Sequence, residues 1–137
     1  MHVTVSGPRG GRVDKQHEVY TIAAIKFFAK HLNINRKKIS IHVNIYKAIH
    51  HMDFDAELHF DDREFVINVC LYNDWLPSVA HEMVHVKQVV RGELTHDTVV
   101  TDADGDDAYN NDPCEIEATS LQYDMVRAFT AKRYYKH

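Results

Sequence analysis

The sequence has few cysteines, no long apolar run and no excess of basic residues. Its 137 residues include two cysteines, Cys70 and Cys114, which lie far apart in the chain. A domain of this length buries a core without the help of disulfide bonds, and two distant cysteines make no disulfide framework. We therefore expect both thiols to be free, as is usual in the cytoplasm.

The other two absences exclude further classes of protein. No apolar stretch approaches the roughly 18 residues that span a bilayer, and the N-terminal stretch MHVTVSGPRGGR lacks the apolar centre of a secretory signal. A formal net charge of -4 argues against a dedicated nucleic-acid-binding protein, which usually carries a basic face. We expect a cytoplasmic protein with no membrane or nucleic-acid partner.

The composition and the apolar pattern indicate one globular domain over residues 1–137. Hydrophobic residues make up 45% and charged residues 26%, a usual balance for such a domain. The pattern predicts an α+β fold with a small sheet of three to four strands. The predicted elements are a helix over 16–33, a strand over 39–45, a hairpin of strands 56–60 and 64–72, a helix from 75 or 78 to 91, and a helix over 113–132.

The remaining segments carry weaker signals. Residues 1–15 are predicted as a loose N-terminal arm or a weak edge strand, and residues 93–112, polar and rich in aspartate, as a loop. Strand 64–72 is apolar on both faces and is expected at the centre of the sheet. Strand 56–60 carries Glu57 and His59 between its apolar residues, which suits an edge. The last helix has a clear start, with Asp112 as N-cap and Pro113 at the first helical position.

The segment HEMVH places His81 and His85 four residues apart on a predicted helix, with Glu82 directly after the first histidine. Residues i and i+4 lie on the same face of a helix, so both imidazoles point toward one place. This is the HExxH pattern, in which two histidines bind Zn²⁺ and the glutamate is the general base. In a chain with 11 histidines the same short pattern also arises by chance, and its two rings then face solvent.

An apolar stripe on this helix favours the metal interpretation. It lies on the side away from the histidines and consists of Val79, Met83, Val86 and Val90. If the stripe packs on the sheet, then the histidines face a different neighbour.

A catalytic zinc site needs a third protein ligand, and three downstream residues are candidates. In PCEIEA, Glu115 shares a helix face with the small Ala118, which allows a close approach to the histidine helix. Glu117 points elsewhere and is the alternative, followed by His96. A carboxylate at the position of Glu115 also suits a capping box with Asp112, so this residue has a purely structural explanation as well.

The two motifs together resemble the gluzincin branch of the zincin metallopeptidases, in which a later helix supplies a glutamate as third zinc ligand. Here HEMVH at 81–85 is followed by EIEA at 115–118. The chain is most similar to small single-domain zincin-like metallopeptidases, some of them phage-encoded, in which a Pro-x-Glu-Ile-Glu-Ala segment follows the histidine helix. Cys114 departs from that pattern, because an aromatic residue often stands there. The resemblance covers roughly residues 54–130.

The resemblance implies a minimal zincin fold with one Zn²⁺ bound by His81, His85 and Glu115. It implies that Glu82 is the catalytic base, taking a proton from water and passing it to the leaving amine. It further implies that the edge strand binds an extended peptide substrate as an added strand. The residues of that edge are Ala56, Glu57, Leu58, His59 and Phe60.

Further roles at this site have several candidates each. The residues considered for stabilising the oxyanion are Tyr109, His96 and Tyr123. Asp74 and Asp124 are predicted to accept hydrogen bonds from the second nitrogen of the histidine rings.

Two classes of function are consistent with these residues. The first is a zinc-dependent metallopeptidase that hydrolyses peptide bonds. The alternative is a zinc-binding regulatory or protein-interaction module with the same fold and little activity, because so small a chain offers little room for substrate beyond one strand edge. A structural zinc site, closed by a fourth ligand such as His96, is a third. The presence of Glu82 favours catalysis, since a structural zinc site requires no base.

Overall fold

The computed structural model describes residues 1–47, 56–71, 75–100 and 104–135. Within these residues the chain forms four α-helices, a short 3-10 helix and a four-stranded sheet, which confirms the predicted mixture of helices and a small sheet. The order along the chain is β1 (His2–Ser6), η1 (Pro8–Gly10), α1 (Lys15–His31), β2 (Ser40–Lys47), β3 (Ala56–Asp61), β4 (Glu64–Leu71), α2 (Trp75–Val90), α3 (Asp106–Asn111) and α4 (Pro113–Tyr135).

The strands lie in the order β1-β2-β4-β3. β1 pairs with β2 and β2 with β4 in parallel, whereas β3 pairs with β4 antiparallel and forms one edge. The predicted hairpin, its edge arm and its central arm are therefore confirmed. Of the two forms predicted for residues 1–15, the loose arm is wrong for His2–Ser6, because these residues are an edge strand paired with β2.

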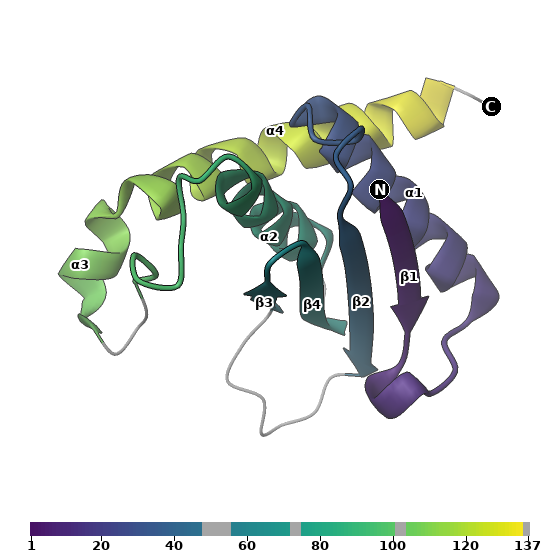
Figure 1. The fold of residues 1–137 in the computed structure, drawn as a ribbon. Helices are drawn as coiled ribbons and strands as arrows, with labels where there is room; N and C mark the ends of the chain where they lie inside the picture. The colour runs from purple at the N-terminus through teal and green to yellow at the C-terminus, as the bar shows by residue number, and fades with distance from the viewer. Residues whose placement is uncertain (48–55, 72–74, 101–103, 136–137) are drawn as a thin grey trace.

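One face of the sheet forms the core. The buried residues alternate along the two central strands and stand in register with one another, as in the pairs Ile41 with Phe65 and Val43 with Ile67. Helices α1 and α2 pack against the sheet, and α4 lies across both of them (Figure 1). His81 and His85 on α2 and Glu115 on α4 therefore lie in the helical layer, beside the edge strand β3.

Local signals define the ends of the helices. The side chain of Asp14 accepts a hydrogen bond from the backbone N–H of Gln16 at 2.8 Å and so caps α1. Gly92, just beyond α2, adopts a φ of 75°, and its N–H bonds to the carbonyl of Val89, which confirms the predicted helix end. Pro113 is the first residue of α4, as predicted.

The loop predicted over residues 93–112 is wrong in part, because Asp106–Asn111 form helix α3. None of the residues of α3 is buried, so this helix has no apolar face that a periodic pattern would reveal. Asp106 and Asp107 lie in its first turn, where negative charge is favourable.

Two further sequence predictions concern the cysteines and the membrane. Cys70 and Cys114 are both free, as expected. Among the helices that the structure describes, none combines the length and the apolar character required to cross a bilayer.

Candidate metal centre

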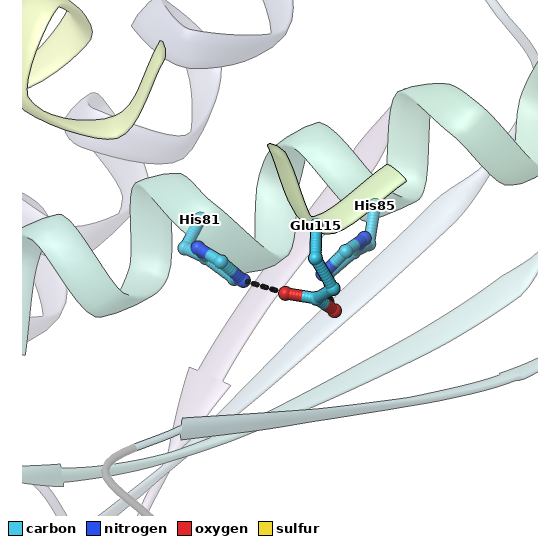
Figure 2. A group of neighbouring side chains, drawn as sticks. All are labelled: His81, His85 and Glu115. Carbon is cyan, nitrogen blue, oxygen red and sulfur yellow. Dashed lines mark hydrogen bonds and ion pairs between the residues drawn. The ribbon is translucent and has the colours of Figure 1, made fainter. Parts of the chain in front are cut away.

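Three side chains from two helices converge between α2 and α4 (Figure 2). His81 Nε2 lies 3.0 Å from one carboxylate oxygen of Glu115, and His85 Nε2 lies 3.0 Å from the other. One donor atom of each residue lies within 4.8 Å of the others. The structure therefore brings together the two histidines of HEMVH and the first glutamate of EIEA.

The positions of these residues follow from helix geometry. His81 and His85 lie one turn apart on α2, and their ring centroids are 4.9 Å apart. Glu115 is in the first turn of α4, which packs along α2. Ala118, one turn further, is fully buried, and its small side chain permits the close approach expected from the sequence.

The second nitrogen of each ring contacts a glutamine. His81 Nδ1 lies 2.7 Å from Gln122 Oε1, and His85 Nδ1 lies 2.7 Å from Gln88 Oε1. The prediction of Asp124 in this role is wrong, because its carboxylate pairs with Arg127 on the surface of α4. Asp74 lies outside the described residues.

Helix spacing is the sequence signal that could have identified these two glutamines as partners of the histidine rings. Gln88 follows His85 by three residues, and Gln122 follows Glu115 by seven, so each shares a helix face with a residue of the cluster. Such contacts hold the orientation of ligating histidines in metal sites.

The alternative third ligands lie elsewhere. The carboxylate of Glu117 binds Lys87 and Gln88, each at 2.9 Å. The ring of His96 stacks on Phe60, with centroids 4.1 Å apart and planes 15° from parallel. Among the described residues, neither belongs to the group around Glu115.

The cluster carries opposite charges close together. Burial opposes the charge of Glu115, but the hydrogen bonds from His81 and His85 hold the pKa of its carboxyl well below its usual range. Burial likewise opposes a charged His85, yet the bond to Glu115 and the nearby Glu82 raise the pKa of its ring from 6.5 to about 8. The pKa of His81 is also raised, because its hydrogen bonds to Glu115 and Gln122 outweigh its burial. In this arrangement the carboxylate of Glu115 favours the protonated form of both rings.

Glu82 is buried next to this cluster, with 9% of its surface exposed. Burial raises the pKa of its carboxyl, although the positive charges on His85 and His81 act in the opposite direction. A carboxylate with a raised pKa is a stronger base than one in water, which is the property that a general base requires.

Glu82 lines a cavity of about 190 Å³ together with His85 and Glu115. The edge strand β3 forms one wall and the segment after α2 forms another, and the lining residues from these two segments are Ala56, Glu57, Leu58, Phe60, Leu94, Val99 and Val100. Four of the five predicted edge residues therefore line the cavity. The fifth, His59, is exposed and pairs with Glu57 at 3.1 Å.

Neither of the two tyrosines named as candidates for stabilising the oxyanion is among the described residues that line the cavity. Tyr109 lies on α3 and is absent from the described lining of the cavity, and Tyr123 is 54% exposed on α4.

Comparisons with protein-family models, curated proteins and solved structures found no match. The chemistry of the site is therefore inferred from its own residues.

The cluster could hold a metal ion, and its donor types suit zinc. Two imidazole nitrogens and one carboxylate oxygen are a donor set of catalytic zinc sites with three protein ligands. Donor atoms around a tetrahedral ion, at bond lengths of about 2.0–2.1 Å, lie about 3.3 Å apart. The two nitrogen–oxygen separations of 3.0 Å run to different oxygens of Glu115, and one donor atom of each residue lies within 4.8 Å of the others, so a small rearrangement of the side chains would bring the three donors around one ion.

Proposed function

We propose that this protein is a zinc-dependent peptidase of the gluzincin type, with Zn²⁺ bound by His81, His85 and Glu115. The observation that carries the proposal is the convergence of these three donor groups beside Glu82, in a cavity with an edge strand as its wall. A cluster formed only for packing would not need a further buried carboxylate at its side.

The residues around the cavity have separate roles in this proposal. A zinc ion bound here would polarise the scissile carbonyl and make water more acidic. Glu82 accepts the proton of the attacking water and gives it to the leaving amine, so that the carboxylate is regenerated. The exposed edge of β3 pairs with the backbone of an extended peptide and directs its carbonyl into the cavity.

The experiment that tests the proposal combines metal content with cleavage of a peptide library. The wild-type protein is expected to bind one zinc ion and to cleave, whereas Glu82→Gln is expected to bind zinc and lose cleavage by about 10²-fold or more. The matched control is Glu18→Gln, which changes a carboxyl group on α1 outside the cavity lining and leaves the proposed base intact.

The size of the cavity favours a second candidate, a zinc-binding interaction module without activity. A volume of about 190 Å³ is below the range of about 300–1,000 Å³ that is common for small-molecule sites. Zinc bound by wild type and by Glu82→Gln, with no cleavage by either protein, would support this module over the peptidase. Failure of the wild type to bind zinc would contradict both.

A further inference from the structure

A chain of hydrogen-bonded polar groups leads from His85 through the buried Gln88 to Glu117 on α4. Its centre is Gln88, which is fully buried one turn after His85. The amide oxygen of Gln88 lies 2.7 Å from His85 Nδ1. Its amide nitrogen donates to the backbone carbonyl of Cys114 and to the carboxylate of Glu117, each at 2.9 Å. Both hydrogens of this nitrogen therefore have an acceptor.

These partners permit one orientation of the Gln88 amide. Turned by half a rotation, the amide oxygen would face the carbonyl of Cys114 and the carboxylate of Glu117, which have no hydrogen to donate. Glu117 is itself held by Lys87, whose ammonium lies 2.9 Å from both carboxylate oxygens. Lys87 also pairs with Glu93 at 2.8 Å. The nitrogen of Gln88 thus faces Glu117, and its oxygen faces His85.

The fixed amide decides the state of the histidine. An amide oxygen only accepts, so His85 Nδ1 must carry a hydrogen, and Nε2 is the nitrogen on the side of Glu115 (Figure 2). The hydrogen bond at one ring nitrogen determines which nitrogen is available to a metal. We infer that Gln88, oriented by Glu117 and the Cys114 carbonyl, is a positioning residue that commits His85 to bind zinc through Nε2. This inference rests on the metal site proposed above.

His81 provides an internal control for the effect of Gln88 on His85. Its Nδ1 contacts Gln122 on α4, which is a different residue on a different helix. A change at Gln88 should therefore alter His85 and leave His81 as it is. A general loss of structure would alter both rings.

The test reads the ring nitrogens directly. Long-range proton–nitrogen NMR spectra separate protonated from unprotonated ring nitrogens, here in metal-free protein at a pH where the rings are neutral. The protein carries Glu115→Ala, so that no carboxylate competes for the hydrogen at His85 Nε2. In this protein, with Gln88 in place, we expect the hydrogen on Nδ1 of His85. In Gln88→Met, which keeps the length of the side chain and removes the acceptor, we expect a mixture of the two tautomers at His85 and an unchanged His81.

Zinc affinity, measured by competition with a chromophoric chelator, is the second readout. Gln88→Met is expected to weaken zinc binding by about 10- to 100-fold, the range found when a partner of a ligating histidine is lost. The matched control is Glu93→Gln, which changes the exposed partner of Lys87 and should leave both readouts unchanged. A hydrogen on His85 Nε2 in the Glu115→Ala protein would overturn the inference, and so would a Gln88→Met variant with an unchanged His85 tautomer and unchanged zinc affinity.

A second pair of variants covers the case in which Gln88→Met does not fold. Glu117→Ala removes one acceptor of the Gln88 amide and should weaken zinc binding, whereas Glu117→Gln retains an acceptor and should restore most of it. Equal zinc affinity in wild type and both variants would contradict the inference. If the Glu115→Ala protein shows the expected tautomer but the wild type binds no zinc, the proposed function fails while the orientation of His85 stands.

Discussion

At the scale of single residues, the phase of a helix decides which carboxylate belongs to the cluster. Glu115 and Glu117 are two positions apart on α4, and two positions correspond to opposite sides of a helix. Glu115 therefore reaches the histidines of α2, and Glu117 reaches Lys87. This separation makes the roles of the two glutamates testable one by one.

Replacing Glu115 should weaken zinc binding more than replacing Glu117. Glu115→Gln removes the negative charge and replaces one carboxylate oxygen with an amide nitrogen that does not bind metal, so we expect zinc affinity to fall by about 100-fold or more, beyond the usual loss for a supporting residue. Competition titration measures this change, with Glu57→Gln as the control because Glu57 lines the same cavity outside the cluster. A Glu115→Gln protein with wild-type affinity would remove Glu115 from the ligand set.

The pKa values of the cluster predict how the stability of metal-free protein depends on pH. The raised pKa of His85, about 8 in place of 6.5, contributes stability that is complete below pH 6.5 and is lost as the pH rises through about 8. Glu115, with its lowered pKa, contributes above its ordinary value of 4.5, and this stability is lost in acid. The contribution of the cluster is therefore largest between these two ordinary values.

Denaturant unfolding of metal-free protein measures whether stability falls as the pH rises, as the raised pKa of His85 predicts. Between pH 6.5 and about pH 9 the contribution of His85 to the free energy of unfolding should fall by about 2 kcal/mol. His85→Gln has no titrating ring at this position and should show a correspondingly smaller decline over the same range. If the free energy of unfolding depended on pH equally in the two proteins, Glu115 would not be stabilising a positive charge on the His85 ring in the folded state.

At the scale of whole elements, the position of Glu115 beside His81 and His85 depends on how α4 is anchored. The first turn of α4 carries Glu115, and its far half packs on α1 through Phe129, which is 3% exposed. The ring of Phe129 lies 5.4 Å from those of Tyr20 and Phe27 and 5.8 Å from that of Phe28. This aromatic group fixes α4 across the helical layer.

Removing that anchor should destabilise the fold. Phe129→Ala is expected to lower the free energy of unfolding by about 3–5 kcal/mol, as is usual for a buried aromatic residue. Ile116→Ala is the control, because Ile116 is an apolar residue of the same helix that is 51% exposed, and its loss should change stability by less than about 0.5 kcal/mol. A similar loss in both variants would contradict the anchoring role.

Elements with a one-sided apolar pattern were predictable from the sequence, and those without one were not. The alternation at Ile41, Val43 and Ile45 identifies β2, because these side chains share the buried face. Helix α3 has no buried face, so its sequence has no period to detect. The parallel pairing of β2 with β4 joins segments that are separate in the chain, and no local pattern specifies it.

The same distinction applies to the group of His81, His85 and Glu115. The convergence of His81 and His85 follows from helix spacing alone, and HEMVH with EIEA indicated where the third residue would come from. The glutamines at the rings were missed because many polar residues occur on both helices. Their contacts, such as Gln122 with His81, depend on the distance and angle between α2 and α4, which the sequence does not reveal.

At the scale of the whole molecule, zinc binding and folding should be coupled. A zinc ion between α2 and α4 would join two helices that the unfolded chain leaves apart, so binding to the folded state raises stability. With free zinc at about 100 times the dissociation constant, the gain is about 2.7 kcal/mol. For a domain of this length we expect a rise in Tm of roughly 10 °C. The measurement is thermal unfolding at about pH 8, where fewer protons compete for the rings.

The comparison that decides the coupling uses a protein without the two rings. The double variant His81→Ala/His85→Ala should unfold at the same temperature with and without zinc, and a chelator should reverse the shift of the wild type. His2→Ala/His31→Ala removes two histidines outside the cluster and should retain the full shift. An equal rise in Tm for wild type and His81→Ala/His85→Ala would mean that zinc acts elsewhere on the molecule, because the stabilisation requires the donor atoms that α2 presents to α4.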